Sequence, residues 1–165
     1  MTPRVALLLA AAVILTGCRA REITSLERME AANMVSEADF AVTLRDWPRA
    51  EGLFTKAAET CPDEGDIWIN LGIVRMRMSN PDGARSAYKA ALADYRDDFK
   101  KDSSDSVPVI RQAYLLVILG RPDDAHSLID KTYAKYPDNR RLKNFVEVGG
   151  LDKIIADPGL KEISP

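Results

Sequence analysis

Residue types that build active sites are scarce in this chain of 165 residues. It has a single histidine, His126, and only two cysteines, Cys18 and Cys61, which are too few for a disulfide framework. No histidine, cysteine or glutamate stands at metal-ligand spacing from His126, and neither a phosphate-binding glycine loop nor a Gly-x-Ser-x-Gly motif occurs. We therefore expect a protein that is not an enzyme and binds no metal, with a structural or solvent-exposed role for His126 and a buried, space-filling role for Cys61.

The chain also has no excess of basic residues. Its 23 Lys and Arg against 25 Asp and Glu leave a formal net charge of −2, so the charge balance does not favour nucleic acid as a partner. Hydrophobic residues make up 46% and charged residues 29% of the chain, which is typical of one globular domain with a single core. After the first residues no long apolar run recurs, so we expect the rest of the chain to be soluble.

One apolar run does occur, at the start of the chain. Arg4 is followed by eleven apolar residues, Val5 to Leu15, in the layout of a secretory signal, and this run is shorter than the roughly 20 residues that cross a bilayer. The sequence Leu15-Thr16-Gly17-Cys18 resembles the lipobox of bacterial lipoproteins. This resemblance implies cleavage before Cys18 and a diacylglycerol on its sulfur; an ordinary signal peptide or an uncleaved anchor is the alternative.

On this reading residues 1–17 are a signal peptide, and residues 18–30 are a lipid-anchored segment that leads into the first helix. The covalent lipid on Cys18 is the only non-protein group expected, and two or three acyl chains hold a protein stably on a membrane. Arg19 follows the cysteine, whereas lipoproteins retained in the inner membrane favour Asp there. In an envelope with two membranes we therefore expect the periplasmic face of the outer membrane.

Small and aromatic residues recur at a spacing of 34 residues. The recurring residues are Ala50, Phe54 and Ala57 in one copy and Ala84, Tyr88 and Ala91 in the next. Trp68 and Leu71-Gly72 stand upstream of the second copy, and Pro62 closes the first. This pattern resembles the tetratricopeptide repeat. The resemblance implies an all-α fold, an α-solenoid of helix-turn-helix pairs in which small residues stand where helices approach closely.

We expect about three repeats with a C-terminal capping helix, since three repeats in series are about the minimum for stability. The expected units are the repeats 31–64, 65–98 and 106–139, followed by the capping helix and tail 140–165. The third repeat is displaced by 41 rather than 34 residues because a segment rich in Ser and Asp, Phe99–Asp105, forms a loop. We expect the tail to cover the last repeat, and the second repeat departs from the pattern by carrying Arg75 at the usual tyrosine.

Helix signals agree with these boundaries. Thr24-Ser25-Leu26-Glu27 predicts a capping box that opens a first helix running to about Leu44. Prolines and glycines then separate six further predicted helices, at about 47–60, 66–78, 81–97, 108–119, 122–136 and 140–148.

In solenoids of this kind the first helix of each pair lines a concave groove, where the resemblance implies that a protein or peptide binds. The groove residues predicted on this basis are Asn70, Ile73, Met76, Arg77, Arg111 and Tyr114. Family members that clamp a carboxylate use an asparagine and a basic residue at the places of Asn70 and Arg111, but Val35 and Val107 stand where the clamp has lysines. An apolar groove with a few polar anchors instead suits an amphipathic helix or an extended peptide.

The sequence thus predicts a non-catalytic protein-interaction scaffold that is tethered to the bacterial envelope membrane. A role in assembling an envelope complex, such as a pilus or a secretion system, is the first hypothesis. One alternative is a self-associating structural lipoprotein, a homo-oligomer in which the groove of one copy holds the tail of another. A second alternative is an accessory subunit of a cell-wall enzyme.

Overall fold

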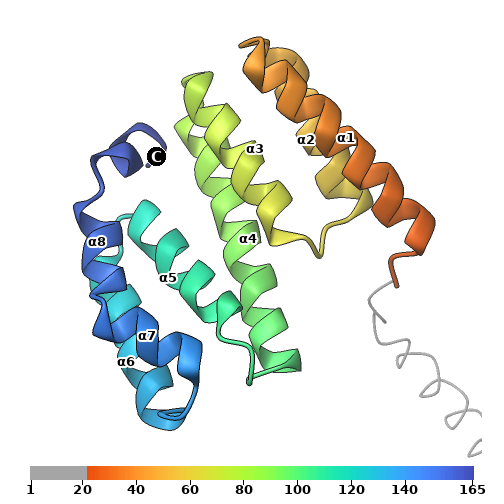
Figure 1. Cartoon of the computed structure of the whole chain (residues 1–165). Helices are drawn as coiled ribbons and strands as arrows, with labels where there is room; N and C mark the ends of the chain where they lie inside the picture. The colour runs from red at the N-terminus through yellow and green to blue at the C-terminus, as the bar shows by residue number, and fades with distance from the viewer. Residues whose placement is uncertain (1–21) are drawn as a thin grey trace, which may run out of the picture.

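The computed structural model describes residues 22–165, which form eight α-helices and a terminal 3-10 helix without any strand. The predicted signal peptide and the predicted lipidation site Cys18 lie outside the described residues. Neighbouring helices stack side by side in a curved array (Figure 1). The elements are α1 (Ser25–Thr43), α2 (Trp47–Thr60), α3 (Gly65–Arg77), α4 (Pro81–Lys101), α5 (Val107–Ile118), α6 (Pro122–Lys135), α7 (Arg140–Glu147), α8 (Gly150–Ala156) and η1 (Pro158–Glu162).

The first six helices form three pairs, α1–α2, α3–α4 and α5–α6, whose members pack against each other. The pairs are joined because α2 also packs on α3, and α4 also packs on α5. The all-α solenoid predicted from the sequence is therefore confirmed.

Helix starts follow from local hydrogen bonds. At α1 the backbone amide of Glu27 donates to the Thr24 hydroxyl at 3.2 Å, while the Thr24 amide donates to the Glu27 carboxylate at 2.8 Å. At α4 the Gly83 amide donates to the Asn80 side chain at 2.9 Å, and Pro81 occupies the first turn, where no amide is needed. The predicted capping box is thus present.

One boundary prediction is wrong, because α4 continues four residues beyond its expected end. Phe99, which was expected in the loop, is helical, and its ring packs edge-on against Tyr136 with centroids 6.1 Å apart. Lys101 pairs with Asp98 at 2.9 Å one turn earlier, which supports the added turn. The loop between the second and third pairs is therefore shortened to residues 102–106.

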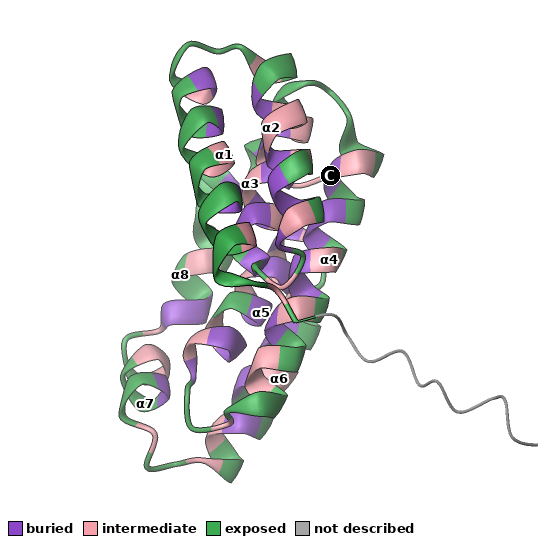
Figure 2. Cartoon of the chain, turned by 90° about the vertical axis from the view of Figure 1, so that its right-hand side faces the viewer, coloured by how far each residue is buried: buried purple, intermediate pink, exposed green. Residues whose placement is uncertain are grey.

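The buried residues, purple in Figure 2, form two adjoining clusters. One consists mainly of residues of α1, α2 and α3 with Ala87 of α4, and the other extends from α3 to the C-terminal end. Trp68 packs against both. Within the second pair the Tyr88 ring fills the space that a Cβ atom on Gly72 would occupy. Ala84 and Ala91 are fully buried at the same interface. Close helix approach at small residues, as expected, holds this pair together.

The C-terminal segment covers more of the molecule than the last pair. Helix α8 packs against α5 and α6, and η1 then carries the chain back to the second pair. There the buried Tyr88 hydroxyl donates to the carbonyl of Ile163 at 2.8 Å, and Arg77 pairs with Glu162 at 2.9 Å. The Arg85 guanidinium also donates to a carbonyl of the last residue, Pro165, at 3.1 Å. The tail therefore ties the third pair to the second.

Candidate functional site

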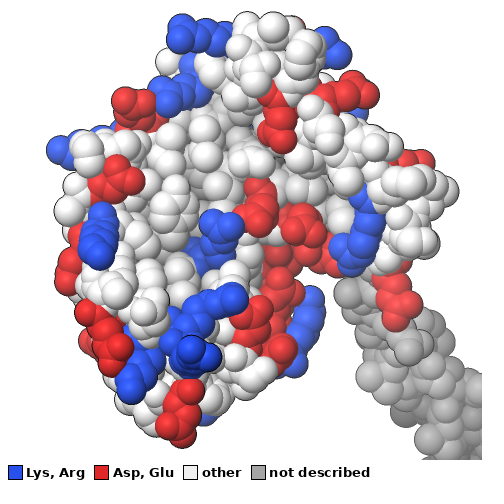
Figure 3. Space-filling view, viewed as in Figure 1, with Lys and Arg blue, Asp and Glu red and all other residues white. Residues whose placement is uncertain are grey.

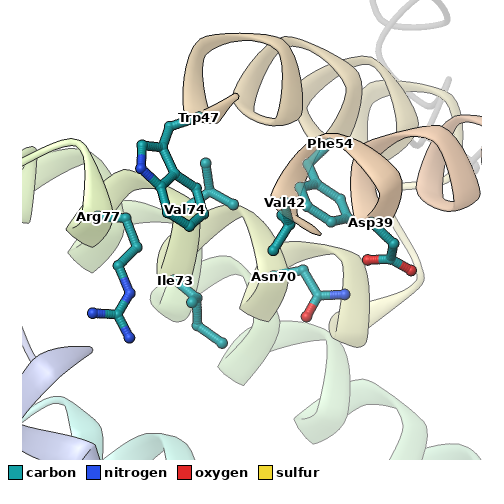
Figure 4. A pocket seen from close by; sticks show the side chains of 8 residues that line it. All are labelled: Asp39, Val42, Trp47, Phe54, Asn70, Ile73, Val74 and Arg77. Atoms are coloured by element: carbon teal, nitrogen blue, oxygen red, sulfur yellow. The ribbon is translucent and has the colours of Figure 1, made fainter. Parts of the chain in front are cut away.

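A groove separates α1 from α3, and we call it the α1–α3 groove. It consists of two adjoining cavities of about 260 and 400 Å³ that share Asn70. The smaller cavity, shown in Figure 4, is lined by Asp39, Val42, Trp47, Phe54, Asn70, Ile73, Val74 and Arg77. The larger cavity is lined by Arg28, Ala31, Ala32, Val35, Ser36, Cys61, Glu64, Asp66, Ile67 and Asn70.

The groove is open because the side chains on its α1 wall are small. Ala31, Ala32, Val35 and Ser36 form most of that wall in the larger cavity, so they leave the space beside α3 unfilled. The floor belongs to the rigid core: Phe54 of α2 is 1% exposed and Ile67 of α3 is 5% exposed. A side chain that enters the groove therefore meets an apolar floor that is already formed.

Polar groups without partners stand along this apolar floor. Asn70 is half-buried where the two cavities meet, and its side chain forms no hydrogen bond with any of residues 22–165. Asp39 faces the same cavity from α1, and no cation of the described chain pairs with it (Figure 4). Both groups keep their hydrogen-bonding capacity for a ligand.

At the outer end of the larger cavity three side chains form a closed cluster. The Arg28 guanidinium binds Asp63 through two nitrogens, at 2.7 and 3.3 Å, and the Cys61 thiol donates to the same carboxylate at 3.4 Å. Burial opposes ionisation of Asp63, but the hydrogen bonds from Arg28 and Cys61 outweigh it and lower its pKa. Burial and the nearby Asp63 together raise the pKa of Cys61, so this thiol is a poor nucleophile.

Acidic residues dominate the same end of the groove. Glu64 and Asp66 both line the larger cavity, and burial followed by the charge of Asp66 raises the pKa of Glu64. Just behind them burial and the charge of Asp98 raise the pKa of Asp94 to about 6. Figure 3 shows acidic side chains gathered along the middle of this face, below a largely uncharged hollow. Arg28 pairs with Asp63 and Arg111 approaches Asp66, so these two cations balance part of the acidic charge at this end of the groove.

The structure places three of the six predicted groove residues in this site. Asn70, Ile73 and Arg77 all line the smaller cavity, although Arg77 is also bound to Glu162 of the tail. Met76 lines neither cavity and instead packs, half-buried, on the second core cluster.

The other two predicted residues, Arg111 and Tyr114, belong to a different cavity of about 350 Å³. This cavity lies between α5 and the C-terminal helices, which contribute Arg141 and Ile154. Arg111 also approaches Asp66, with 3.5 Å between the charged groups. Five of the six predicted residues therefore line two different cavities, and Arg111 connects the second cavity to Asp66 of the α1–α3 groove.

Sequence reasoning missed Trp47 and Phe54, which reach the groove from α2. Both are apolar residues on a second helix of a pair, and the repeat pattern assigns such helices to the outer face.

Cys61 is 2% exposed, and the His126 side chain is 46% exposed with its nearest acid, Asp152, at 3.9 Å. No three His, Cys, Asp or Glu side chains cluster as a metal site within residues 22–165. Within the same range, no helix has the length and apolar character needed to cross a bilayer.

The tetratricopeptide repeat family model matches residues 35–99. This segment contains the second half of α1 together with α2, α3 and most of α4. It therefore includes the residues that line the groove except Arg28, Ala31 and Ala32 of the first half of α1. No curated protein matches the chain.

Proposed function

We propose that the chain is a protein-interaction scaffold whose α1–α3 groove receives the partner. The tetratricopeptide repeats over residues 35–99 support this proposal. The observation that carries this proposal is the free Asn70 amide at the centre of an apolar groove with a rigid floor. The Asn70 amide remains accessible to solvent, so its donor and acceptor are available to a partner that displaces water from the groove.

The partner segment we propose is extended rather than helical. The amides and carbonyls in the middle of a helix already bond to each other, whereas an extended backbone offers a free donor and acceptor to the Asn70 side chain. Helix α3 has 13 residues and is about 20 Å long, which corresponds to roughly six extended residues. Apolar side chains of such a segment would contact Ile73 and Val42, and its backbone would bond to Asn70.

The Asn70→Ala variant tests this mode of binding. Loss of one or two hydrogen bonds at about 0.5–1.5 kcal/mol each weakens binding by roughly three- to tenfold or more. Asn144→Ala, at an exposed position on α7, is the matched control and is expected to leave binding unchanged. A partner that binds both variants equally well would exclude Asn70 from the site.

We further propose that the protein is tethered to the bacterial envelope by a lipid on Cys18 and helps to assemble an envelope complex such as a pilus or secretion system. The lipobox-like sequence ending at Cys18 supports the tether. A scaffold with a groove between α1 and α3 supports an assembly role, because it can hold a partner close to the membrane without catalysing a reaction. The periplasmic face of the outer membrane remains the proposed site.

One experiment tests tether and partner together. The full chain is expressed in a bacterium with two membranes, with a photo-crosslinking residue in place of Ser36 in the groove or of the exposed Lys56 on α2 as control. We expect acyl groups on Cys18, and an envelope protein that is crosslinked from Ser36 and not from Lys56. An unmodified Cys18 would refute the tether. A partner crosslinked equally from both positions would refute the groove.

A further inference from the structure

Helix α1 carries an apolar stripe on a face that belongs to neither the groove nor the core. Leu26, Met29, Phe40 and Leu44 are 57%, 57%, 58% and 60% exposed, and we call these four residues the α1 stripe. Seven large apolar side chains are markedly exposed in the described part of the chain, and these four all lie at α1. Figure 2 looks at this side of the molecule and shows α1 lined with exposed residues.

Helix geometry places the four residues in one line. Leu26 and Leu44 are 18 positions apart, which is five full turns, and Met29 and Phe40 are 11 positions apart, close to three turns. The face of α1 that packs on α2 is marked instead by Ala31, Ala38 and Ala41, all of them buried. The α1 stripe therefore runs along the whole helix on a third face.

The spacing of the α1 stripe is symmetrical along the helix. The midpoint of Leu26 and Leu44 is position 35, and the midpoint of Met29 and Phe40 is position 34.5. A two-fold axis at this level turns the stripe onto itself. In an antiparallel pair of α1 helices, Leu26 of one copy would then face Leu44 of the other, and Met29 would face Phe40. Self-complementarity of this kind is what an isologous interface requires.

We propose that the α1 stripe is a docking surface for a second copy of this chain, with the two α1 helices antiparallel. The polar positions of this face agree with that arrangement, since Asn33 would face Glu37 of the other copy, an amide donor against a carboxylate. Arg49 of the same chain already lies 3.9 Å from Glu37, which reduces the repulsion between the two carboxylates at the centre.

The size of the surface determines the strength of the pair. Eight large apolar side chains that each lose roughly half of their surface would bury on the order of 800 Å² of apolar area. This is below the roughly 1,200–2,000 Å² that stable specific interfaces bury, so the pair is weak and reversible. A bilayer is a poorer occupant, because helices that lie in a membrane surface carry Lys and Arg beside their apolar face, whereas Glu30 and Glu37 border this stripe.

Cysteine crosslinking of the full chain tests the proposal. In a Leu26→Cys/Leu44→Cys double variant the two thiols of one chain are about 27 Å apart along the helix and cannot bridge each other. In the antiparallel pair each meets its counterpart from the other copy. Mild oxidation of membranes and soluble extract is expected to give a disulfide-linked dimer from the double variant. Each single variant, and the Leu26→Cys/Lys56→Cys control, should give no more dimer than the unmodified chain.

A second substitution separates specific pairing from random collision. Met29→Glu, added to the double variant, places a carboxylate opposite Phe40 and is expected to lower the dimer yield at least tenfold. The melting temperature should not change, since this side chain is 57% exposed. Strong crosslinking of Leu26→Cys alone would show a different register and overturn the proposal. Absence of dimer from the double variant would overturn it as well, and would leave the preceding segment, a membrane or another protein as the occupant.

Discussion

Gly72→Ala is the substitution that best tests how the second helix pair is held together. In an ordinary helix interior this change stabilises a protein by about 0.5–1 kcal/mol, because glycine loses more backbone entropy on folding. Here the added Cβ would overlap the ring of Tyr88, which is fully buried and cannot swing into solvent. Either the ring or the whole of α4 must move.

The net effect can be worked from these contacts. Overpacking a filled core costs about 1–3 kcal/mol, and a shifted Tyr88 also weakens its buried hydrogen bond to Ile163, which is worth about 1 kcal/mol. After subtraction of the gain in helix propensity, we expect a loss of about 2 kcal/mol in the free energy of unfolding. For a chain of this size that lowers the melting temperature by roughly 4–8 °C.

The chain offers a matched control in Gly52→Ala. Gly52 also lies inside a helix, but a Cβ there would meet no atom within 4 Å. Thermal unfolding of both full-length variants, followed by far-ultraviolet circular dichroism, should show Gly52→Ala at or above the wild-type melting temperature and Gly72→Ala well below it. If the two variants shifted together in the same direction, the reasoning from the Tyr88 contact would be refuted.

Two further predictions concern buried polar groups. Burial and the charge of Asp98 raise the pKa of Asp94 from 3.8 to about 6. The contribution of this carboxyl to the free energy of unfolding is therefore fully present below its unfolded-state pKa and is lost as the pH rises through about 6. Asp94→Asn should therefore stabilise the protein by about 1–2 kcal/mol at neutral pH, after allowance for solvent screening, and by almost nothing near pH 4. Denaturant titration at both pH values measures this difference. An equal gain in stability at both pH values would contradict the prediction. Tyr88→Phe leaves the buried Ile163 carbonyl without its donor, at a cost of about 1–3 kcal/mol, and should increase the rate at which carboxypeptidase removes the last residues. Unchanged proteolysis would show that this hydrogen bond does not hold the tail.

Local signals in the sequence were sufficient for most of the helix boundaries. The Thr24 capping box and the proline in the first turn of α4 act within a few residues, so they can be identified without knowing the fold. The predicted end of α4 was wrong because its added turn depends on a distant residue, Tyr136, against which the Phe99 ring packs.

The candidate site was only partly visible in the sequence, for a related reason. The repeat pattern indicates which face of a first helix lies toward the groove, and on that basis Asn70, Ile73 and Arg77 were named. It contains no information about Trp47 and Phe54, because their access to the groove depends on how far α1 and α3 stand apart.

The sequence by itself determined the repeat architecture of this protein, since a period of 34 residues and small residues such as Gly72 constrain neighbouring segments directly. Only the tertiary structure decided which of the predicted residues line the α1–α3 groove and which lie beside the C-terminal helices. The tail returns to the second pair through contacts 75 to 85 positions apart in the chain, among them Tyr88 with Ile163 and Arg77 with Glu162. Such contacts depend on the shape of surfaces that exist only after the helices have packed. Helical periodicity indicates which residues share a face, and tertiary packing decides whether that face is covered.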